Sequence, residues 1–262
     1  LGVTALASLG LLVFVNGERA LAEFEADLSS QLLLMQDELH LPQGSQRSHA
    51  RLAELTTEAR ARFDGRRKLL ALEKLGYSAR RLGDTGTAIL LFREALELHA
   101  LAGSSDSPSA QEDLRALGWC LTVELRFEEA AALYEQGFAH SVPDSLEAEL
   151  LVAAYVDTLL QGRLEDRLLR YLQEEEDPLG RLEALVERLK LERPDHRLVQ
   201  FNLKLTLASF LQLQLRREEA RELISECLEY CEQSLPLEDP LRLRVKISWS
   251  KVFGDAFWMG RE

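Results

Sequence analysis

The chain has 262 residues, of which 46% are hydrophobic and 29% charged, so it is apolar enough for a continuous core and too apolar for disorder. Its formal net charge of −13 repels phosphate backbones, and we expect no nucleic-acid binding. Three cysteines do not suggest a disulfide framework, which favours a reducing, cytoplasmic setting. Leu, Ala, Glu and Arg dominate the composition and favour helix over sheet.

The first residues raise the question of a membrane span, because no charge occurs from Leu1 to Asn16. The uncharged run ends before Glu18, short of the roughly 20 apolar residues of a span. No basic residues precede it as they would in a signal peptide. We expect a soluble helix and no membrane association. The chain starts with Leu rather than Met, which suggests a fragment of a longer protein.

The first predicted hairpin covers residues 3–40. Apolar residues recur at helical spacing on both sides of Gly17, at Leu6, Leu9, Gly10, Val13, Ala22 and Ala26. We therefore predict two helices joined by a turn at Gly17. A polar break follows at residues 41–48, and an irregular extra helix is predicted over residues 48–63.

The clearest pattern lies between Leu72 and Leu98, where two short helices are predicted on either side of Gly83. Small residues stand where the two helices would touch, and large residues flank them: Gly76, Ala79, Ala88 and Ala95, with Leu72, Leu75, Ile89 and Phe92. This spacing resembles the tetratricopeptide repeat (TPR), a helical hairpin whose copies stack. The resemblance places one hairpin at residues 66–101.

Weaker matches to the same pattern follow along the chain. The resemblance implies hairpins at residues 110–143, 146–177 and 198–234, a partial one at 241–262, and an irregular helix at 179–191. Their turns are predicted at Leu125, Gly162, Leu215 and Gly260, farther apart than in regular arrays. Such loose spacing is similar to the repeat arms of bacterial STAND-type ATPases and related transcription activators.

The resemblance implies an all-α fold, a right-handed α-solenoid of stacked antiparallel hairpins that forms a single domain over residues 1–262. In this family the first helix of each hairpin lines an inner groove. The corresponding positions here are Glu73, Tyr77, Arg80, Arg115, Trp119, Thr122, Val152, Val156, Leu159, Leu205, Ser209 and Gln212. Tyr, Trp and Arg are typical binding anchors, because they bury much area with few rotamers frozen. Tyr77 and Trp119 are equally compatible with packing between hairpins.

The groove residues also bear on the kind of partner. Family members that hold the carboxylate of chaperone tails use Lys and Asn at these positions. Glu73 and Tyr77 stand there in this chain, which argues against that role. We expect a non-enzymatic scaffold without cofactors that binds a protein or peptide segment, as part of a larger regulatory protein. The alternative is a ligand-sensing arm of a transcription regulator or ATPase.

Other chemistry-bearing residues have simpler explanations. Cys227 and Cys231 lie one helical turn apart, but no histidine is near in sequence, so we predict buried packing and no metal site. The glycine-rich stretch 83–87 lacks the lysine of a phosphate-binding loop. No local motif groups Ser, His and Asp for catalysis. The five histidines are scattered and predicted at the surface: His40, His49, His99, His140 and His196. Helix-dipole contacts are predicted for His40, His99 and His140.

Overall fold

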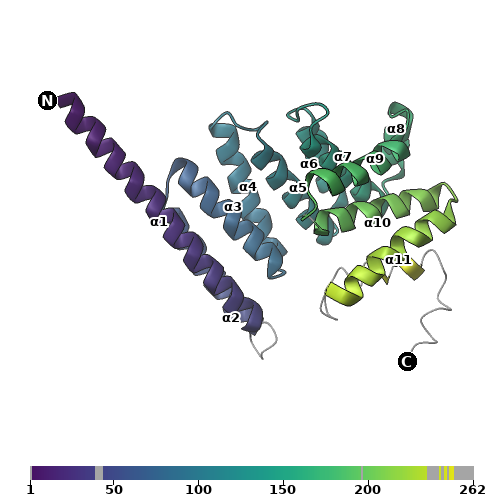
Figure 1. The fold of residues 1–262 in the computed structure, drawn as a ribbon, viewed down its shortest axis with the longest axis horizontal. Helices are drawn as coiled ribbons and strands as arrows, with labels where there is room; N and C mark the ends of the chain where they lie inside the picture. Colours follow the sequence, from purple (N-terminus) through teal and green to yellow (C-terminus); the bar gives the residue numbers. More distant parts are fainter. Residues whose placement is uncertain are drawn as a thin grey trace. The chain divides into compact units, whose positions relative to one another are not determined.

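The computed structural model describes residues 2–38, 44–195, 197–234, 242, 245, 246 and 248–250; at residues 2–16, 36–38, 44, 45, 198 and 234 it describes the backbone alone. Every regular element in these residues is an α-helix (Figure 1). The chain divides into two compact units, Leu1–Leu133 and Tyr134–Glu262. The prediction of an all-α, TPR-like array of helix hairpins is confirmed, and each unit is described by itself below.

The first unit consists of successive helices that pack in chain order. They are α1 (Gly2–Glu38), α2 (Gly44–Arg62), α3 (Gly65–Arg81), α4 (Thr85–Leu101) and α5 (Pro108–Val123). Each helix packs against the next, and α3 also contacts α1 and α5. The following helix, α6 (Phe127–Phe138), crosses from the first unit into the second. Side chains from α3, α4 and α5 therefore meet in one interior.

The predicted turn at Gly17 is wrong, because α1 continues through this residue to Glu38. The partner of α1 is α2, which runs back along it. Phe24 meets the ring of Phe63 edge-on at 5.4 Å between centroids, and the Ser48 hydroxyl donates to the Met35 carbonyl at 3.1 Å. A glycine inside a helix costs about 1 kcal/mol, which such packing offsets. The helix predicted as irregular at residues 48–63 is thus the second half of the first hairpin.

The second hairpin, α3 and α4, has the contacts that its small residues predict. Gly76 faces the buried ring of Phe92, and a Cβ atom added at Gly76 would lie 2.9 Å from Phe92 Cε1. Asp84 caps α4 by accepting a hydrogen bond from the Thr87 amide at 3.0 Å. The turn between the helices contains Gly83 with φ +76°, a conformation that glycine adopts without strain.

The same turn recurs at the ends of α3, α5, α7 (Leu146–Gly162) and α10 (Arg197–Leu213). In each, one residue has a positive φ, and the next residue's amide donates to the carbonyl five positions before it, as in a Schellman motif. These amide–carbonyl pairs are Asp84 and Ala79, Arg126 and Leu121, Leu164 and Leu159, and Arg216 and Leu211, at 2.8–3.0 Å. The left-handed residues are Gly83, Leu125, Arg163 and Leu215. Helix α4 ends in the same turn, with Gly103 at φ +66° and the Ser104 amide donating to the His99 carbonyl at 2.9 Å, so the turn alone does not mark the first helix of a hairpin. In α3, α5, α7 and α10 it joins the helix to the second helix of its hairpin, and these four turns fix the register between repeats.

The second unit contains, besides α7 and α10, the helices α8 (Glu165–Glu174), α9 (Pro178–Glu192) and α11 (Arg217–Ser234). The core includes one apolar face of α9, with Leu182, Leu185 and Leu189, and this helix packs against both α7 and α10. All residues of α8 are described and none is buried. The helix predicted as irregular at residues 179–191 therefore buries one face against α7 and α10.

A bidentate ion pair fastens α9 to α7. The Arg181 guanidinium donates to both carboxylate oxygens of Glu149, at 2.7 and 2.9 Å, and also to Glu175 at 2.7 Å. These hydrogen bonds raise the pKa of Arg181. Pro178 starts the helix and Asp177 caps it through the Gly180 amide at 2.9 Å.

The last predicted hairpin, residues 241–262, lies largely outside the described residues, including its turn at Gly260. Val245 and Trp249 are described, and both lie in the core of the second unit. Among the described helices, none is long and apolar enough to cross a bilayer. The prediction of a single repeat domain over the whole chain stays a prediction.

The contact at Gly76 predicts a loss of stability on adding one methyl group. We expect Gly76→Ala to lower the free energy of unfolding by about 1 kcal/mol or more, because the methyl group collides with the fully buried Phe92 ring. The matched control is Gly86→Ala in α4, where the nearest atom to an added Cβ is 3.9 Å away. That change should be neutral or stabilise by about 0.5 kcal/mol. Urea unfolding compares the two; equal stability of both variants would contradict the packing.

The left-handed leucines predict the opposite effect. Leu125 and Leu215 are exposed and have φ of 60° and 63°. A left-handed conformation costs an L-residue about 1–2 kcal/mol, more than the entropy cost of glycine. We therefore expect Leu125→Gly and Leu215→Gly each to stabilise the chain by up to about 1 kcal/mol. Leu101→Gly, at an exposed helical position, should destabilise it by about 0.5–1 kcal/mol. Thermal melting checks this: the melting temperature should rise for Leu125→Gly and Leu215→Gly and fall for Leu101→Gly.

Candidate functional site

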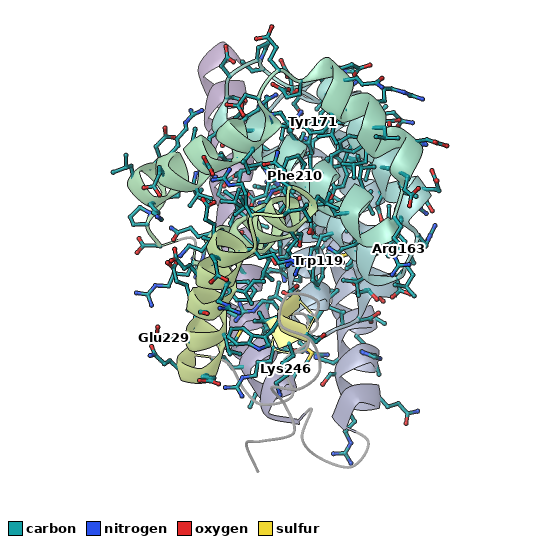
Figure 2. The ribbon with its side chains drawn as sticks, turned by 90° about the vertical axis from the view of Figure 1, so that its right-hand side faces the viewer. Trp119, Arg163, Tyr171, Phe210, Glu229 and Lys246 are labelled. Atoms are coloured by element: carbon teal, nitrogen blue, oxygen red, sulfur yellow. The ribbon has the colours of Figure 1, made fainter. Side chains whose placement is uncertain are left out.

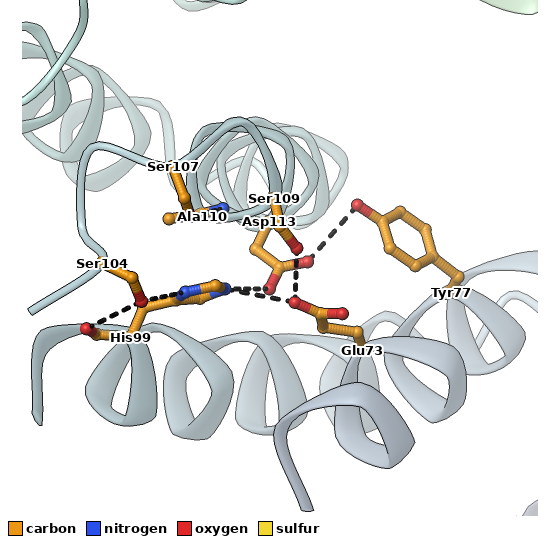
Figure 3. Close-up of polar contacts among 8 residues, drawn as sticks. All are labelled: Glu73, Tyr77, His99, Ser104, Ser107, Ser109, Ala110 and Asp113. Atoms are coloured by element: carbon orange, nitrogen blue, oxygen red, sulfur yellow. Dashed lines mark hydrogen bonds and ion pairs between the residues drawn. The ribbon is translucent and has the colours of Figure 1, made fainter. Parts of the chain in front are cut away.

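Three charged or titratable side chains from consecutive helices meet in the interior of the first unit (Figure 3). Glu73 comes from α3, His99 from α4 and Asp113 from α5, and they are 8%, 4% and 1% exposed. Charged residues are rarely buried so completely unless they are paired. We call this group the Glu73 cluster.

The cluster is centred on Nε2 of His99. This atom lies 3.1 Å from Glu73 Oε1 and 3.7 Å from Asp113 Oδ2. Hydroxyl groups hold the outer side of the cluster: Ser109 donates to Glu73 Oε1 at 2.6 Å, and Tyr77 donates to Asp113 Oδ1 at 3.4 Å. Asp113 Oδ2 itself has no hydrogen-bond partner. One imidazole nitrogen thus faces two carboxyl groups, one of which carries an unsatisfied oxygen.

Burial shapes the protonation of this region. Desolvation, together with the negative charge of Glu73, raises the pKa of Asp113 to about 8. Desolvation also raises the pKa of Tyr77, and the Asp113 charge adds to that shift. Tyr77 therefore remains a neutral hydrogen-bond donor. The two buried carboxyl groups are held close enough that both being charged is unfavourable without a nearby cation.

Ser104 fixes the orientation of the imidazole. Its hydroxyl lies 3.0 Å from His99 Nδ1 and donates to the His99 carbonyl at 3.2 Å. Both contacts are satisfied together only if Nδ1 carries a hydrogen and donates it to Ser104. A nucleophilic serine requires the reverse, because its hydroxyl must donate to the imidazole. The Ser104–His99 contact therefore orients His99 and does not activate Ser104.

The Glu73 cluster also has the composition of a metal site. One atom from each of Glu73, His99 and Asp113 lies within 4.8 Å of the others. Imidazole nitrogen and carboxylate oxygen are common ligands of zinc and related ions. Among the described residues, it is the one group of at least three His, Cys, Asp or Glu side chains whose ligand atoms all lie within 4.8 Å of one another.

The surface prediction for His99 is wrong, because this residue is buried in the cluster. The three residues are far apart in sequence, so no local spacing marks them. The sequence of α4 nevertheless indicates that His99 is buried, because it continues the apolar stripe of Ala88, Phe92 and Ala95 at helical intervals. A polar residue in such a stripe predicts a buried partner.

A second group lies beside the first and shares Tyr77 with it. The Arg80 guanidinium carbon lies 5.3 Å from the ring centroid of Tyr77 and 5.3 Å from that of Trp119, which Figure 2 labels. The Tyr77 ring also meets Phe92 edge-on, with 5.0 Å between centroids. We call Tyr77, Arg80 and Trp119 the Arg80 cluster. The Arg80–Tyr77 contact lies within α3, and the Arg80–Trp119 contact joins α3 to α5. Burial lowers the pKa of Arg80.

The predicted groove residues of the first unit divide between these two groups. Three of the six form the Arg80 cluster and are half-buried, whereas Glu73 is buried in its own cluster. Thr122 is also buried and donates to the Gly118 carbonyl at 3.0 Å. Arg115 is half-buried, with its guanidinium 3.8 Å from the Glu112 carboxylate. The binding role of these residues stays a proposal.

The predicted groove residues of the second unit are mostly apolar and largely inaccessible. Val156, Leu159 and Leu205 are 0%, 0% and 2% exposed. Val152, Ser209 and Gln212 are half-buried. Phe210 on α10, labelled in Figure 2, is buried in the same core. The second unit therefore does not repeat the polar and aromatic face of α3 and α5.

The register of the hairpin α7–α8 explains why Val156 and Leu159, predicted groove residues on α7, are buried. The left-handed residue is Arg163, labelled in Figure 2, and not the predicted Gly162. Moving the turn by one residue moves each equivalent position by one along α7. The positions that correspond to Glu73, Tyr77 and Arg80 then become Ala153, Asp157 and Leu160, in place of Val152, Val156 and Leu159. Asp157 and Leu160 are half-buried, whereas Val156 and Leu159 belong to the interior.

Comparison with known proteins gives a structural likeness. No family model matches the chain, and no curated protein matches it. Among solved structures, the chain is similar to a putative kinesin light chain from Podosopora anserina with nearly identical TPR-like repeats. The two are 15% identical, the alignment covers 87% of this chain and 97% of that one, and the TM-score is 0.48. The TPR-like character of this chain rests on its own hairpins and recurring turns.

The raised pKa of Asp113 predicts a pH dependence of stability in chelator-containing buffer. An unfolded aspartate has a pKa of about 3.9, so the folded chain holds a proton that the unfolded chain releases. This contribution is complete below about pH 4 and is lost as the pH rises through about 8. We therefore expect the free energy of unfolding of the wild type to fall as the pH rises, and to fall more steeply than that of Asp113→Asn. The two slopes should differ by up to about 1.4 kcal/mol per pH unit.

Urea unfolding from pH 5 to pH 9 measures this difference. The control is Asp106→Asn, which removes an exposed carboxylate near the start of α5 and should keep the wild-type pH profile. Parallel profiles for the wild type and Asp113→Asn would show that Asp113 holds no extra proton in the folded chain.

Proposed function

We propose that this chain is a protein-interaction scaffold that binds a protein or peptide segment on the face formed by α3 and α5. The supporting observation is the Arg80 cluster, in which one guanidinium lies over two aromatic rings from equivalent helices. All three side chains are half-buried, so each keeps some accessible surface. Such a binding role is expected for a module of a larger regulatory protein.

The physical basis is that the cluster is preorganised. Aromatic and arginine side chains dominate binding energy because they offer large area and a polar group at once. Their conformations are already restricted here, since Tyr77 is held by Phe92 and Asp113, and Arg80 is held between the two rings. A partner therefore loses less free energy to side-chain ordering when it binds.

The competing explanation is that these residues only pack the helices together. It applies best to Tyr77, whose ring contacts the fully buried Phe92 and whose hydroxyl reaches Asp113. Tyr77→Ala would therefore disturb both the core and any binding. Trp119 contacts Arg80 from α5 and is half-buried, so it gives the cleaner test of the two explanations.

We test the proposal with random peptides displayed on phage and selected on the immobilised chain. Selected peptides should bind Trp119→Ala and Arg80→Ala at least about tenfold more weakly than the wild type, which corresponds to about 1.4 kcal/mol. The matched control is Leu101→Ala, an exposed apolar truncation on α4, which should leave binding unchanged. Circular dichroism verifies that each variant is folded. Peptides that bind all of these proteins equally, or no selected peptides at all, would contradict the proposal.

A further inference from the structure

We propose that Glu73, His99 and Asp113 form a buried binding site for one divalent transition-metal ion, with Zn²⁺ as the best-fitting ion. The site adjoins the proposed binding face, with which it shares Tyr77, but its three ligands are other residues. It joins α3, α4 and α5, the helices that supply one ligand each. Three observations support it: the spacing of the ligand atoms, the unsatisfied oxygen of Asp113 and the orientation of His99.

The spacing matches a tetrahedral ion. Zinc bonds to imidazole nitrogen and carboxylate oxygen are about 2.0–2.2 Å long, so neighbouring ligand atoms in a tetrahedron are about 3.4 Å apart. His99 Nε2 lies 3.1 Å from Glu73 Oε1 and 3.7 Å from Asp113 Oδ2. Helices α3, α4 and α5 therefore hold two of the three separations near the required value, and the third is at most 4.8 Å.

The unsatisfied oxygen points to a missing partner. Asp113 is 1% exposed, yet its Oδ2 atom has no hydrogen-bond partner, although buried polar atoms are almost always paired. This atom lies on the side of the carboxyl group that faces His99 (Figure 3). A cation between Asp113 and His99 would complete its coordination and offset the repulsion between the two buried carboxyl groups.

The orientation of His99 supports the same conclusion. Because Nδ1 donates to Ser104, Nε2 is the ring nitrogen that faces the two carboxyl groups, 3.1 Å from Glu73 Oε1 and 3.7 Å from Asp113 Oδ2. Nε2 and Glu73 Oε1 can share a hydrogen at this distance, and a cation in its place would bind the Nε2 lone pair and both carboxylates. Metal-binding histidines characteristically donate their other ring hydrogen to an oxygen acceptor. The other two ligands accept hydrogen bonds, Glu73 from the Ser109 hydroxyl and Asp113 from the Tyr77 hydroxyl, and these bonds orient them.

The ligand set selects the class of ion. One nitrogen and two carboxylate oxygens suit Zn²⁺ and neighbouring first-row dications, whereas Ca²⁺ takes six to eight oxygen ligands. Three protein ligands leave one tetrahedral position for a water molecule or a second carboxylate oxygen. Because the ligands come from three helices, the ion would fasten α5 to the hairpin of α3 and α4.

The experiment uses the full chain, stripped with a chelator and then titrated with Zn²⁺ alone. We expect one ion per chain by elemental analysis after gel filtration and a rise in melting temperature of about 5 °C or more. Co²⁺ should produce visible absorption bands of nitrogen and oxygen coordination without thiolate bands. His99→Ala and Asp113→Asn should lose the ion, the thermal shift and the Co²⁺ bands.

Two sets of variants keep the test decisive. Asp113→Asn preserves the shape of the side chain, so retained helicity with lost ion binding would support the site and not a folding defect. Cys227→Ser and His140→Ala remove other metal-binding groups, and both should keep wild-type Zn²⁺ binding. The proposal is overturned if the wild type binds no ion. It is also overturned if Asp113→Asn binds as well as the wild type, or if Cys227→Ser abolishes binding.

Discussion

The close contact between Gly76 and Phe92 sets the spacing on which the first unit depends. Without a side chain at Gly76, α3 approaches α4 until the backbone meets the Phe92 ring. Glu73 and Tyr77 flank Gly76 on α3, so the same approach carries Glu73 to His99 and the Tyr77 ring to Phe92. One packing constraint therefore determines where both the buried charges and the aromatic residues lie.

The α3–α4 hairpin was predictable because local rules and packing agree there. Small residues at the contact, glycine in the left-handed turn and an Asp cap all specify one conformation. The N-terminal helix shows the opposite case, since Gly17 resembles a turn but lies within α1. Contacts with α2 and α3, which are distant in sequence, override the local preference of glycine.

The candidate sites were only partly predictable, for two physical reasons. First, Arg163 adopts the left-handed conformation although the neighbouring Gly162 would adopt it at lower steric cost. This one-residue difference changes every assignment on α7. Second, the Glu73 cluster depends on three helices, so the position of His99 in the buried stripe of α4 indicates burial but does not identify its partners. The Arg80 cluster could be anticipated, because Tyr77 and Trp119 occupy equivalent positions before equivalent turns.

We infer that α3, α4 and α5 form one cooperative structure organised by the Gly76–Phe92 contact. Native-state hydrogen exchange tests it most directly, because amides that open together share one opening free energy. The buried amides of α3, α4 and α5 should converge on one opening free energy, and Gly76→Ala should lower it equally in all three helices. Exchange of α5 at a lower, separate free energy that Gly76→Ala leaves unchanged would contradict the claim.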